Sequence, residues 1–124
     1  MSTMKNPVSY FEIPVNDLAR AEAFYTHVFD SEFERTHIDG NDMAMFSFDS
    51  QWAGATGALV QGESYVPSKA GARLYFNTTN IDNTLQKVIA VGGKVLYPKT
   101  SIGEYGWVAE FEDSEGNCIA LHEE

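Results

Sequence analysis

The sequence contains a single cysteine, Cys118, and no long apolar run. One cysteine excludes a disulfide within the chain and favours a reducing compartment. A membrane span needs about 18 to 20 consecutive apolar residues, and no stretch of this sequence approaches that length. The N-terminal segment MSTMKNP has no apolar signal core. We therefore expect a cytoplasmic protein without a membrane partner.

Basic residues are scarce: Lys and Arg number 8 against 18 Asp and Glu, which gives a net charge of −10. This charge repels phosphate backbones and anionic lipid surfaces, so we expect no nucleic acid partner. Two explanations of the acidity stay open, namely solubility and a preference for cationic ligands. With 124 residues, 44% of them hydrophobic, the chain can bury one sizeable core, and we expect one domain over residues 1–124.

Several catalytic motifs are absent from the sequence. No glycine-rich loop leads into a helix, as a phosphate site requires, because residues 54–57 precede a predicted strand. No serine stands in a nucleophile elbow. Cys118 lies within the predicted final strand, where a buried thiol is inert. Carboxylates, histidines, one arginine and aromatic side chains are left as the candidate functional groups.

Two stretches of the chain repeat the same pattern. Residues 10–33 and 73–96 both run from a strand through a polar cap into an amphipathic helix, and then into a second strand. The offset between them is 63 residues, and the apolar positions that match at this spacing are Ile13 and Phe76, Leu18 and Ile81, Tyr25 and Val88, and Phe33 and Leu96. Internal duplication predicts two similar modules that enclose a cleft between them.

The first module is predicted to contain a strand, a helix and three further strands. Residues 8–15 alternate in strand fashion, and Asn16 or Asp17 caps a helix whose apolar positions recur at helical spacing. Those apolar positions are Leu18, Ala21, Tyr25, Val28 and Phe29. Turns at residues 39–41 and 54–57 separate three short apolar runs.

The second module is predicted to have the same order. Residues 62–71 are rich in turn formers and link the two modules. Asn80 then caps a helix that ends at Gly92 and Gly93, which can adopt a left-handed conformation. The apolar stripe of this helix consists of Ile81, Leu85, Val88 and Ile89. The remaining strands are expected at residues 94–97, 107–112 and 117–122.

Three segments resemble a known family: PVNDLARAEAFY, GGKVLYPKT and GWVAEFEDSEGNCIAL. They look like the vicinal oxygen chelate superfamily, which includes glyoxalase I, bleomycin-resistance proteins, fosfomycin-resistance enzymes and extradiol dioxygenases. The resemblance covers nearly the whole chain. It implies an α+β fold of two βαβββ modules, about residues 7–62 and 72–124, whose cupped mixed sheet surrounds a small-molecule cleft. Many relatives are dimers and some exchange modules between chains, so we expect a homodimer.

The resemblance also identifies where a metal would be bound. Metal-using members of the superfamily take their ligands from the first and last strands of each module, where His, Gln or Glu is usual. These four positions fall on Tyr10, Ala58, Arg73 and Ala120. An arginine cannot coordinate a cation, and an alanine offers no donor atom. We therefore expect no metal and no other cofactor.

Strand alternation predicts which side chains line the cleft. The candidate ligand-binding residues are Tyr10, Glu12, Trp52, Arg73, Tyr75, Trp107 and His122. Two roles stay open for Arg73: an internal bridge to Glu12 or Glu110, or an anchor for a ligand carboxylate. The aromatic side chains suit flat or apolar molecules. Glu12 and Glu110 are also the candidate acid or base residues.

The leading hypothesis is a metal-free protein that binds or sequesters a small molecule, which is aromatic or carries a carboxylate. One alternative is a glyoxalase-like lyase or isomerase. Such an enzyme would use either unconventional metal ligands, namely Glu12, Glu110 and His122, or one of the two glutamates as an acid or base. Another alternative is an interaction module whose halves pair between chains.

Overall fold

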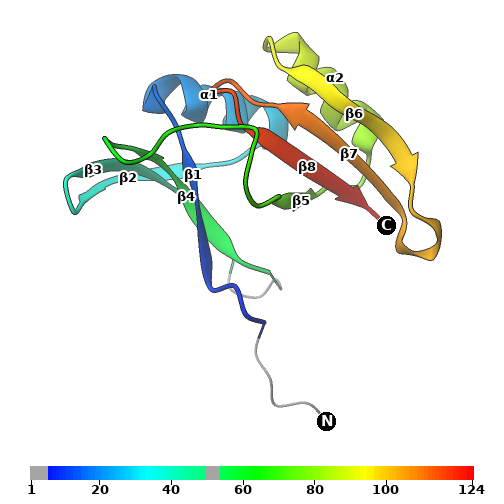
Figure 1. Cartoon of the computed structure of the whole chain (residues 1–124), viewed down its shortest axis with the longest axis horizontal. Helices are drawn as coiled ribbons and strands as arrows, with labels where there is room; N and C mark the ends of the chain where they lie inside the picture. Colours follow the sequence, from blue (N-terminus) through cyan, green and yellow to red (C-terminus); the bar gives the residue numbers. More distant parts are fainter. Residues whose placement is uncertain (1–5, 50–53) are drawn as a thin grey trace.

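The computed structural model describes residues 6–49 and 54–124, which form two successive modules with the same order of elements (Figure 1). Module one consists of β1 (Tyr10–Pro14), α1 (Leu18–Phe29), β2 (Phe33–Ile38), β3 (Asn41–Phe46) and β4 (Thr56–Gln61). Module two consists of β5 (Tyr75–Asn77), α2 (Ile81–Ala90), β6 (Lys94–Ser101), a 3-10 turn (Gly103–Tyr105), β7 (Trp107–Glu112) and β8 (Cys118–Glu123). The βαβββ order therefore occurs twice.

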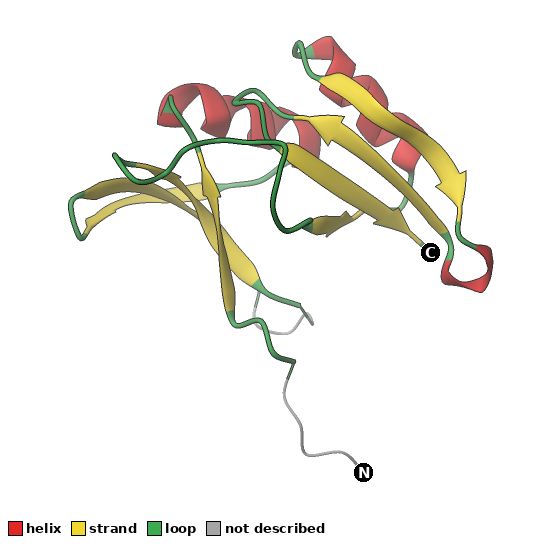
Figure 2. Ribbon diagram, viewed as in Figure 1, coloured by secondary structure: helices red, strands yellow, loops and turns green. Residues whose placement is uncertain are grey.

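Each module forms its own four-stranded mixed sheet (Figure 2). The strand order is β1-β4-β3-β2 in module one and β5-β8-β7-β6 in module two. The first strand of each module pairs in parallel with the last strand, and the other neighbours are antiparallel. A parallel pair needs a long connection, which the helix and the two middle strands supply. The predicted α+β class and paired βαβββ modules are confirmed.

The two helices begin in the same way, 63 residues apart. The side chain of Asp17 accepts a hydrogen bond from the backbone amide of Arg20 at 3.0 Å, and the side chain of Asn80 accepts one from Asn83 at 3.0 Å. Each cap satisfies an amide that the first turn of a helix leaves without a partner. Among the described residues, no helix is long and apolar enough to cross a membrane.

A second repeated contact ties the last strand of each module to its helix. The Oε1 atom of Gln61, at the end of β4, accepts a hydrogen bond from the amide of Leu18 at 2.8 Å. The Oε1 atom of Glu123, at the end of β8, accepts one from the amide of Ile81 at 2.7 Å. The internal repeat therefore extends beyond the apolar pattern to the polar groups that fix the helix starts.

The two modules share one hydrophobic core, and both helices lie on the upper side of the view in Figure 1. Ring contacts connect α1 of module one with the sheet of module two. Phe29 stacks on Phe76 of β5 with centroids 4.7 Å apart, and Phe24 lies 6.0 Å from Phe111 of β7. Burying one such side chain stabilises a fold by about 1.5–3 kcal/mol. α1 therefore contributes directly to the cohesion between the modules, together with Phe11 of β1 and Phe46 of β3, whose rings also contact Phe76.

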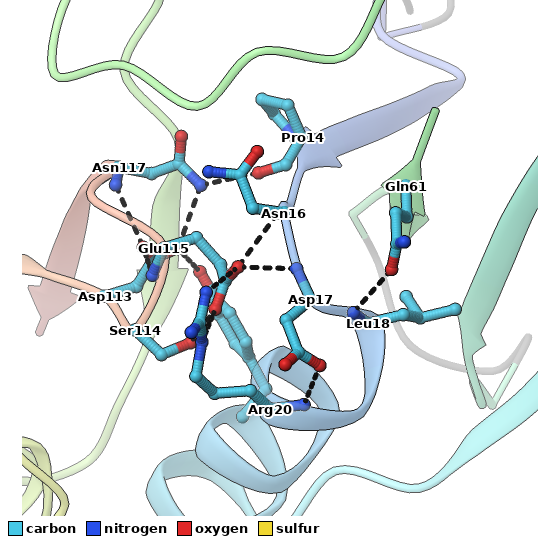
Figure 3. A network of polar contacts seen from close by, with 11 residues as sticks. Pro14, Asn16, Asp17, Leu18, Arg20, Gln61, Asp113, Ser114, Glu115 and Asn117 are labelled. Atoms are coloured by element: carbon cyan, nitrogen blue, oxygen red, sulfur yellow. Dashed lines mark hydrogen bonds and ion pairs between the residues drawn. The ribbon is translucent and has the colours of Figure 1, made fainter. Parts of the chain in front are cut away.

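A polar network adds to this apolar contact between the modules (Figure 3). Glu115, in the turn between β7 and β8, accepts hydrogen bonds at 2.9 Å from the backbone amides of Asn16 and Asp17, at the start of α1. Its carboxylate also forms an ion pair with Arg20, with an Nε to Oε2 distance of 2.8 Å. Burial alone would raise the pKa of Glu115, but these hydrogen bonds, with one from Ser114, lower it to about 2.

The same network holds a buried tyrosine. The Tyr25 hydroxyl donates to Asp113 Oδ2 at 2.7 Å, and the amides of Glu115 and Asn117 donate to Oδ1 of that carboxylate. Asn117 in turn donates from Nδ2 to the carbonyl oxygen of Pro14 at 2.8 Å. Burial, followed by the charge of Asp113, raises the pKa of Tyr25 well above its ordinary value. The turn between β7 and β8 is thus bonded to both β1 and α1.

Some predicted details of the helices are wrong. Ile89, assigned to the apolar stripe of α2, is 59% exposed, and Thr84 is buried in its place. The hydroxyl of Thr84 lies 2.8 Å from that of Thr78 and donates to the carbonyl oxygen of Asn80, so its burial leaves no polar group unsatisfied. In α1 the stripe also includes Phe24, which the prediction left out.

The strands follow the prediction with shifts at their ends. The turn at residues 39–41 is confirmed, because Asp39 and Gly40 both have positive φ angles, 54° and 78°, as a two-residue hairpin requires. The predicted loop at residues 54–57 is too long, since β4 begins at Thr56. β6 continues to Ser101 rather than ending at residue 97, and two register shifts accompany its pairing with β7.

Candidate functional site

The open face of sheet one, which faces away from the helices, carries a carboxylate held by two phenols. Tyr10 and Glu12 lie on the same face of β1, and the hydroxyl of Tyr10 donates to Glu12 Oε2 at 3.0 Å. The hydroxyl of Tyr65, from the linker, donates to Glu12 Oε1 at 2.7 Å. Both oxygens of Glu12 are therefore oriented by the protein itself.

Both phenols stay protonated across the physiological range. Burial, followed by the hydrogen bond to Glu12, raises the pKa of Tyr10 to about 12. The hydrogen bond to Glu12, followed by burial, raises the pKa of Tyr65. A phenol that donates to a carboxylate loses this bond when it ionises, and two negative charges then repel each other. Tyr10 and Tyr65 consequently act as hydrogen-bond donors at this site.

Small apolar side chains lie beneath this carboxylate. Ala58 of β4 is the register partner of Glu12 and is fully buried, as is Val60. Met43 of β3 joins them in a second, smaller hydrophobic cluster, against which Tyr65 packs. The ring of Tyr65 thus fixes the start of the linker on the open face of sheet one.

After Tyr65, successive residues of the linker (residues 62–74) alternate between lining a groove and facing β7. Figure 1 shows it in green, passing from one sheet across to the other. Its even-numbered residues Val66, Ser68, Ala70, Ala72 and Leu74 line a groove. Two odd-numbered residues form ion pairs with β7: Lys69 with Glu112 at 3.2 Å, and Arg73 with Glu110 at 2.5 Å. The linker therefore follows the period of two of an extended strand although no sheet pairing is assigned to it.

The groove has a volume of about 370 Å³ and lies between β1, the linker and the start of β8; we call it the linker groove. Residues 11–14 of β1 form one wall and residues 117–119 form another. Most of the lining is apolar or small, and Glu12 is the only formally charged residue among the described residues that line it. An apolar groove with few polar groups is the usual form of a small-molecule site.

Arg73 is engaged within the protein. Its Nη1 atom bonds Glu110 Oε2, and the Sγ atom of Cys118 lies 3.7 Å from the other oxygen of that carboxylate. Burial, followed by the negative charge of Glu110, raises the pKa of the Cys118 thiol, which disfavours the reactive thiolate. The internal bridge, one of the two roles predicted for Arg73, is thus present with Glu110 as its partner.

Tyr75 and His122 lie apart from the linker groove. Tyr75 is 54% exposed on the open face of sheet two, beside its register partner Ala120. On the same face, His122 Nε2 lies 2.6 Å from the carbonyl oxygen of Tyr105. Trp52 lies outside the described residues. The structure therefore brings Tyr10 and Glu12 together, and separately Arg73 and Glu110.

Trp107 faces the opposite side of its sheet. Strand alternation places it with Ala109 and Phe111, which belong to the core. The Nζ atom of Lys99 lies 4.8 Å from the centre of its ring and also forms ion pairs with Asp82 of α2 and with Glu123. Trp107 thus belongs to the contact between α2 and sheet two, and the expectation that it lines the cleft is not supported by this position.

The side chains at the family's four metal-ligand positions do not fit a divalent cation. Ala58 and Ala120 are fully buried methyl groups, Tyr10 donates a hydrogen bond to Glu12, and Arg73 is a cation. Glu12, Glu110 and His122, the unconventional set, have separate partners. Over the part of the chain that the structure describes, no three His, Cys, Asp or Glu residues lie close enough to hold a metal ion.

A larger, polar hollow of about 830 Å³ lies between the end of α1 and the start of α2. Its lining combines Asn and Thr side chains from the end of β5, the loop before α2 and the first turn of α2 with His122 and four charged residues, namely Asp30, Lys87, Glu123 and Glu124. Thr78, Asn80 and Thr84 in this lining already bond one another or the backbone of α2. We place the candidate site in the linker groove, because apolar walls and one oriented carboxylate suit a ligand better than a wide polar surface.

Sequence reasoning missed the part played by the linker. Tyr65 was not among the candidate ligand-binding residues, and neither was any of the small residues of the linker. The signal was present in the alternation of VPSKAGARL, where small or apolar residues at positions 66, 68, 70, 72 and 74 alternate with positions that include Lys69 and Arg73. Its proline and glycine made this segment look like a turn.

Comparison with known proteins agrees with the fold. Residues 8–121 match the model of the Glyoxalase/Bleomycin resistance protein/Dioxygenase superfamily. A glyoxylase-like domain-containing protein from Didymella fabae is 30% identical over 118 residues, which cover 92% of this chain and 91% of that protein. These two matches extend over both modules and the linker.

Solved structures show the same architecture. The glyoxylase/bleomycin resistance protein/dioxygenase domain from Frankia sp. EAN1pec superposes with a TM-score of 0.75 at 18% identity, covering 97% of this chain and 98% of that one. TnmS3, an antibiotic binding protein from Streptomyces sp. CB03234, superposes with a TM-score of 0.73 at 22% identity, covering 99% and 98%. The family-model match over residues 8–121 and the 30% identical relative show that the chain belongs to the Glyoxalase/Bleomycin resistance protein/Dioxygenase superfamily.

Proposed function

We propose that this protein binds a small molecule in the linker groove and does so without a metal ion. The observation that carries the proposal is the groove itself, whose walls are apolar and whose one formal charge is an oriented carboxylate. The buried alanines and the arginine at the family's metal positions support the metal-free part. TnmS3, a structural relative, is described as an antibiotic binding protein, which supports the binding of a small molecule.

The apolar lining of the groove favours a ligand with a large apolar part. Flat or aromatic molecules suit a groove lined by Phe11, Val66 and Leu74. The expected carboxylate anchor at Arg73 would have to displace Glu110 from an existing ion pair, which is costly for a partly buried carboxylate. We therefore propose an aromatic ligand, and a carboxylate on that ligand has little support because Arg73 is already paired with Glu110.

A compound screen with a blocked variant tests this proposal. Ala72 lines the groove, so Ala72→Phe should fill it, whereas Ala90→Phe adds the same side chain to an exposed position at the end of α2. Flat apolar compounds should raise the melting temperature of the wild type and of the Ala90 variant, but not that of the Ala72 variant. Equal shifts in all three proteins would place binding elsewhere and contradict the proposal.

Elemental analysis of protein purified without chelators tests the metal-free part separately. We expect less than stoichiometric zinc, nickel, manganese and iron. One equivalent of any of these ions, together with turnover that depends on it, would favour the glyoxalase-like lyase or isomerase instead. The metal-free enzyme alternative needs Glu12 or Glu110 as an acid or base, but the two carboxylates are already bonded to tyrosines and to Arg73, respectively.

We also propose that the protein is a cytoplasmic homodimer. The lone Cys118 supports a reducing compartment. Large exposed aromatic side chains, such as Tyr75 at 54% and Tyr105 at 71%, support a further contact surface. Light scattering after size exclusion should give twice the mass of 13.8 kDa, and a monomer at micromolar concentration would contradict the dimer.

A further inference from the structure

We infer that the Glu12 carboxylate selects a positively charged nitrogen on the ligand, so that the linker groove binds an apolar organic cation such as an aromatic amine. This inference rests on the proposed small-molecule function and adds the charge of the ligand to it. It follows from the distribution of charges around the groove: Glu12 is the one formally charged residue in the described lining, and the two neighbouring cations of the linker are paired with carboxylates of β7.

The two cations of the linker are paired with carboxylates of β7. Lys69 and Arg73 flank Ala70 and Ala72 in the linker but form ion pairs with Glu112 and Glu110 of β7. The alternation of the linker therefore turns both cations towards sheet two. No carboxylate of β7 and no cation of the linker lines the groove among the described residues, so Glu12 determines the sign of its charge.

Glu12 also has hydrogen-bonding capacity left for a ligand. Each carboxylate oxygen can accept about two hydrogen bonds, and each here receives one, from Tyr10 or from Tyr65. The two phenols hold the carboxylate in place before a ligand arrives, which reduces the entropy lost on binding. A protonated amine could therefore donate to either oxygen without displacing a phenol, and such charge-assisted bonds are about twice as strong as neutral ones.

Long-range electrostatics act in the same direction. The net charge of −10 raises the local concentration of small cations around the molecule and disfavours anions. This general field does not favour one site over another. Removing a charge elsewhere on the surface should therefore lower the affinity for a cationic ligand much less than removing the charge of Glu12. The comparison between two such positions separates the local effect from the general one.

Three probes with one ring system test the inference: 1-naphthylmethylammonium, 1-naphthalenemethanol and 1-naphthoate. Their dissociation constants are measured by titration calorimetry at constant ionic strength. We expect wild-type protein to bind the ammonium probe on the order of tenfold more tightly than the alcohol, and the carboxylate most weakly. Glu12→Gln should abolish the preference for the ammonium probe while leaving affinity for the alcohol within about twofold.

Glu34→Gln is the matched control. It removes the same charge from an exposed position on β2 of the same sheet and should keep the preference. Equal affinity for ammonium and alcohol in the wild type, or a preference that survives Glu12→Gln, would overturn the inference and leave the proposed function standing. Failure of all three probes to bind at millimolar concentration would overturn both.

Discussion

Replacing Glu115 by glutamine tests how the two modules are held together. The Glu115 side chain is fully buried, and its two oxygens accept hydrogen bonds from the amides of Asn16 and Asp17, from Arg20 and from the hydroxyl of Ser114. Glutamine keeps the shape of the side chain but replaces one accepting oxygen by an NH2 group, which donates hydrogen bonds and cannot accept them. At least one donor in the network therefore loses its acceptor, and Arg20 loses its counter-ion.

The expected loss of unfolding free energy is about 2–3 kcal/mol at neutral pH. The pKa of Glu115 falls from an ordinary 4.5 to about 2, which corresponds to about 3 kcal/mol in favour of the ionised form at 1.36 kcal/mol per pKa unit. Arg20 is 54% exposed, so water screens its charge and reduces this figure somewhat. The resulting value of about 2–3 kcal/mol agrees with the loss of one or two hydrogen bonds to a charged group.

The same folded-state pKa predicts how the effect depends on pH. Because the pKa is lower in the folded than in the unfolded chain, the contribution of Glu115 is complete above its unfolded pKa and is lost as pH falls towards about 2. A protonated glutamate resembles glutamine. The difference in unfolding free energy between wild type and Glu115→Gln should therefore be largest at pH 7 and shrink as the pH falls below about 4.

Urea unfolding followed by circular dichroism at pH 7, 5 and 3 measures this difference. Glu104→Gln, an exposed carboxylate in the 3-10 turn, controls for the loss of one negative charge and should change stability by less than about 0.5 kcal/mol. A loss below about 0.5 kcal/mol for Glu115→Gln, or a loss that stays constant with pH, would show that the network does not hold the modules together.

Three further predictions concern single contacts. Tyr25→Phe removes a buried donor to Asp113 and should cost about 1–3 kcal/mol in urea unfolding; an unchanged midpoint would contradict this. Gly57→Ala would place a Cβ 2.0 Å from the carbonyl oxygen of Phe11, so the pairing of β1 with β4 should weaken and the unfolding free energy should fall by about 1–3 kcal/mol. An unchanged unfolding free energy would contradict this close approach. Tyr10 should titrate near pH 12 by NMR and at a lower pH in Glu12→Gln; identical titration in both proteins would refute the role of Glu12.

Much of the fold follows from local sequence patterns. The helices of residues 18–29 and 81–90 were predictable because their apolar spacing and caps lie within a few residues of one another. The mixed sheets followed from the family resemblance, since periodicity alone does not place β1 beside β4. The burial of Thr84 in place of Ile89 was not predictable, because it depends on a hydrogen bond to the loop before α2.

The candidate site was less accessible to sequence reasoning. Tyr10 and Glu12 were identified from strand alternation, and the bond between them follows from their spacing of two residues. The partnership with Tyr65 joins residues 53 positions apart through a linker without regular structure, so no local pattern indicates it. Trp107 was a different case, since its alternation with Ala109 and Phe111 already indicated a position on the core side of β7.

The start of α1 is completed by a residue that lies 99 positions further along the chain than Asn16. During synthesis, α1 leaves the ribosome long before Glu115 is made, so the amides of Asn16 and Asp17 just before the helix bond to water or another temporary acceptor in the meantime. Module one therefore gains these two hydrogen bonds only after the turn between β7 and β8 has been made. If the chain were cut between the modules, the first fragment could regain them only by binding the second.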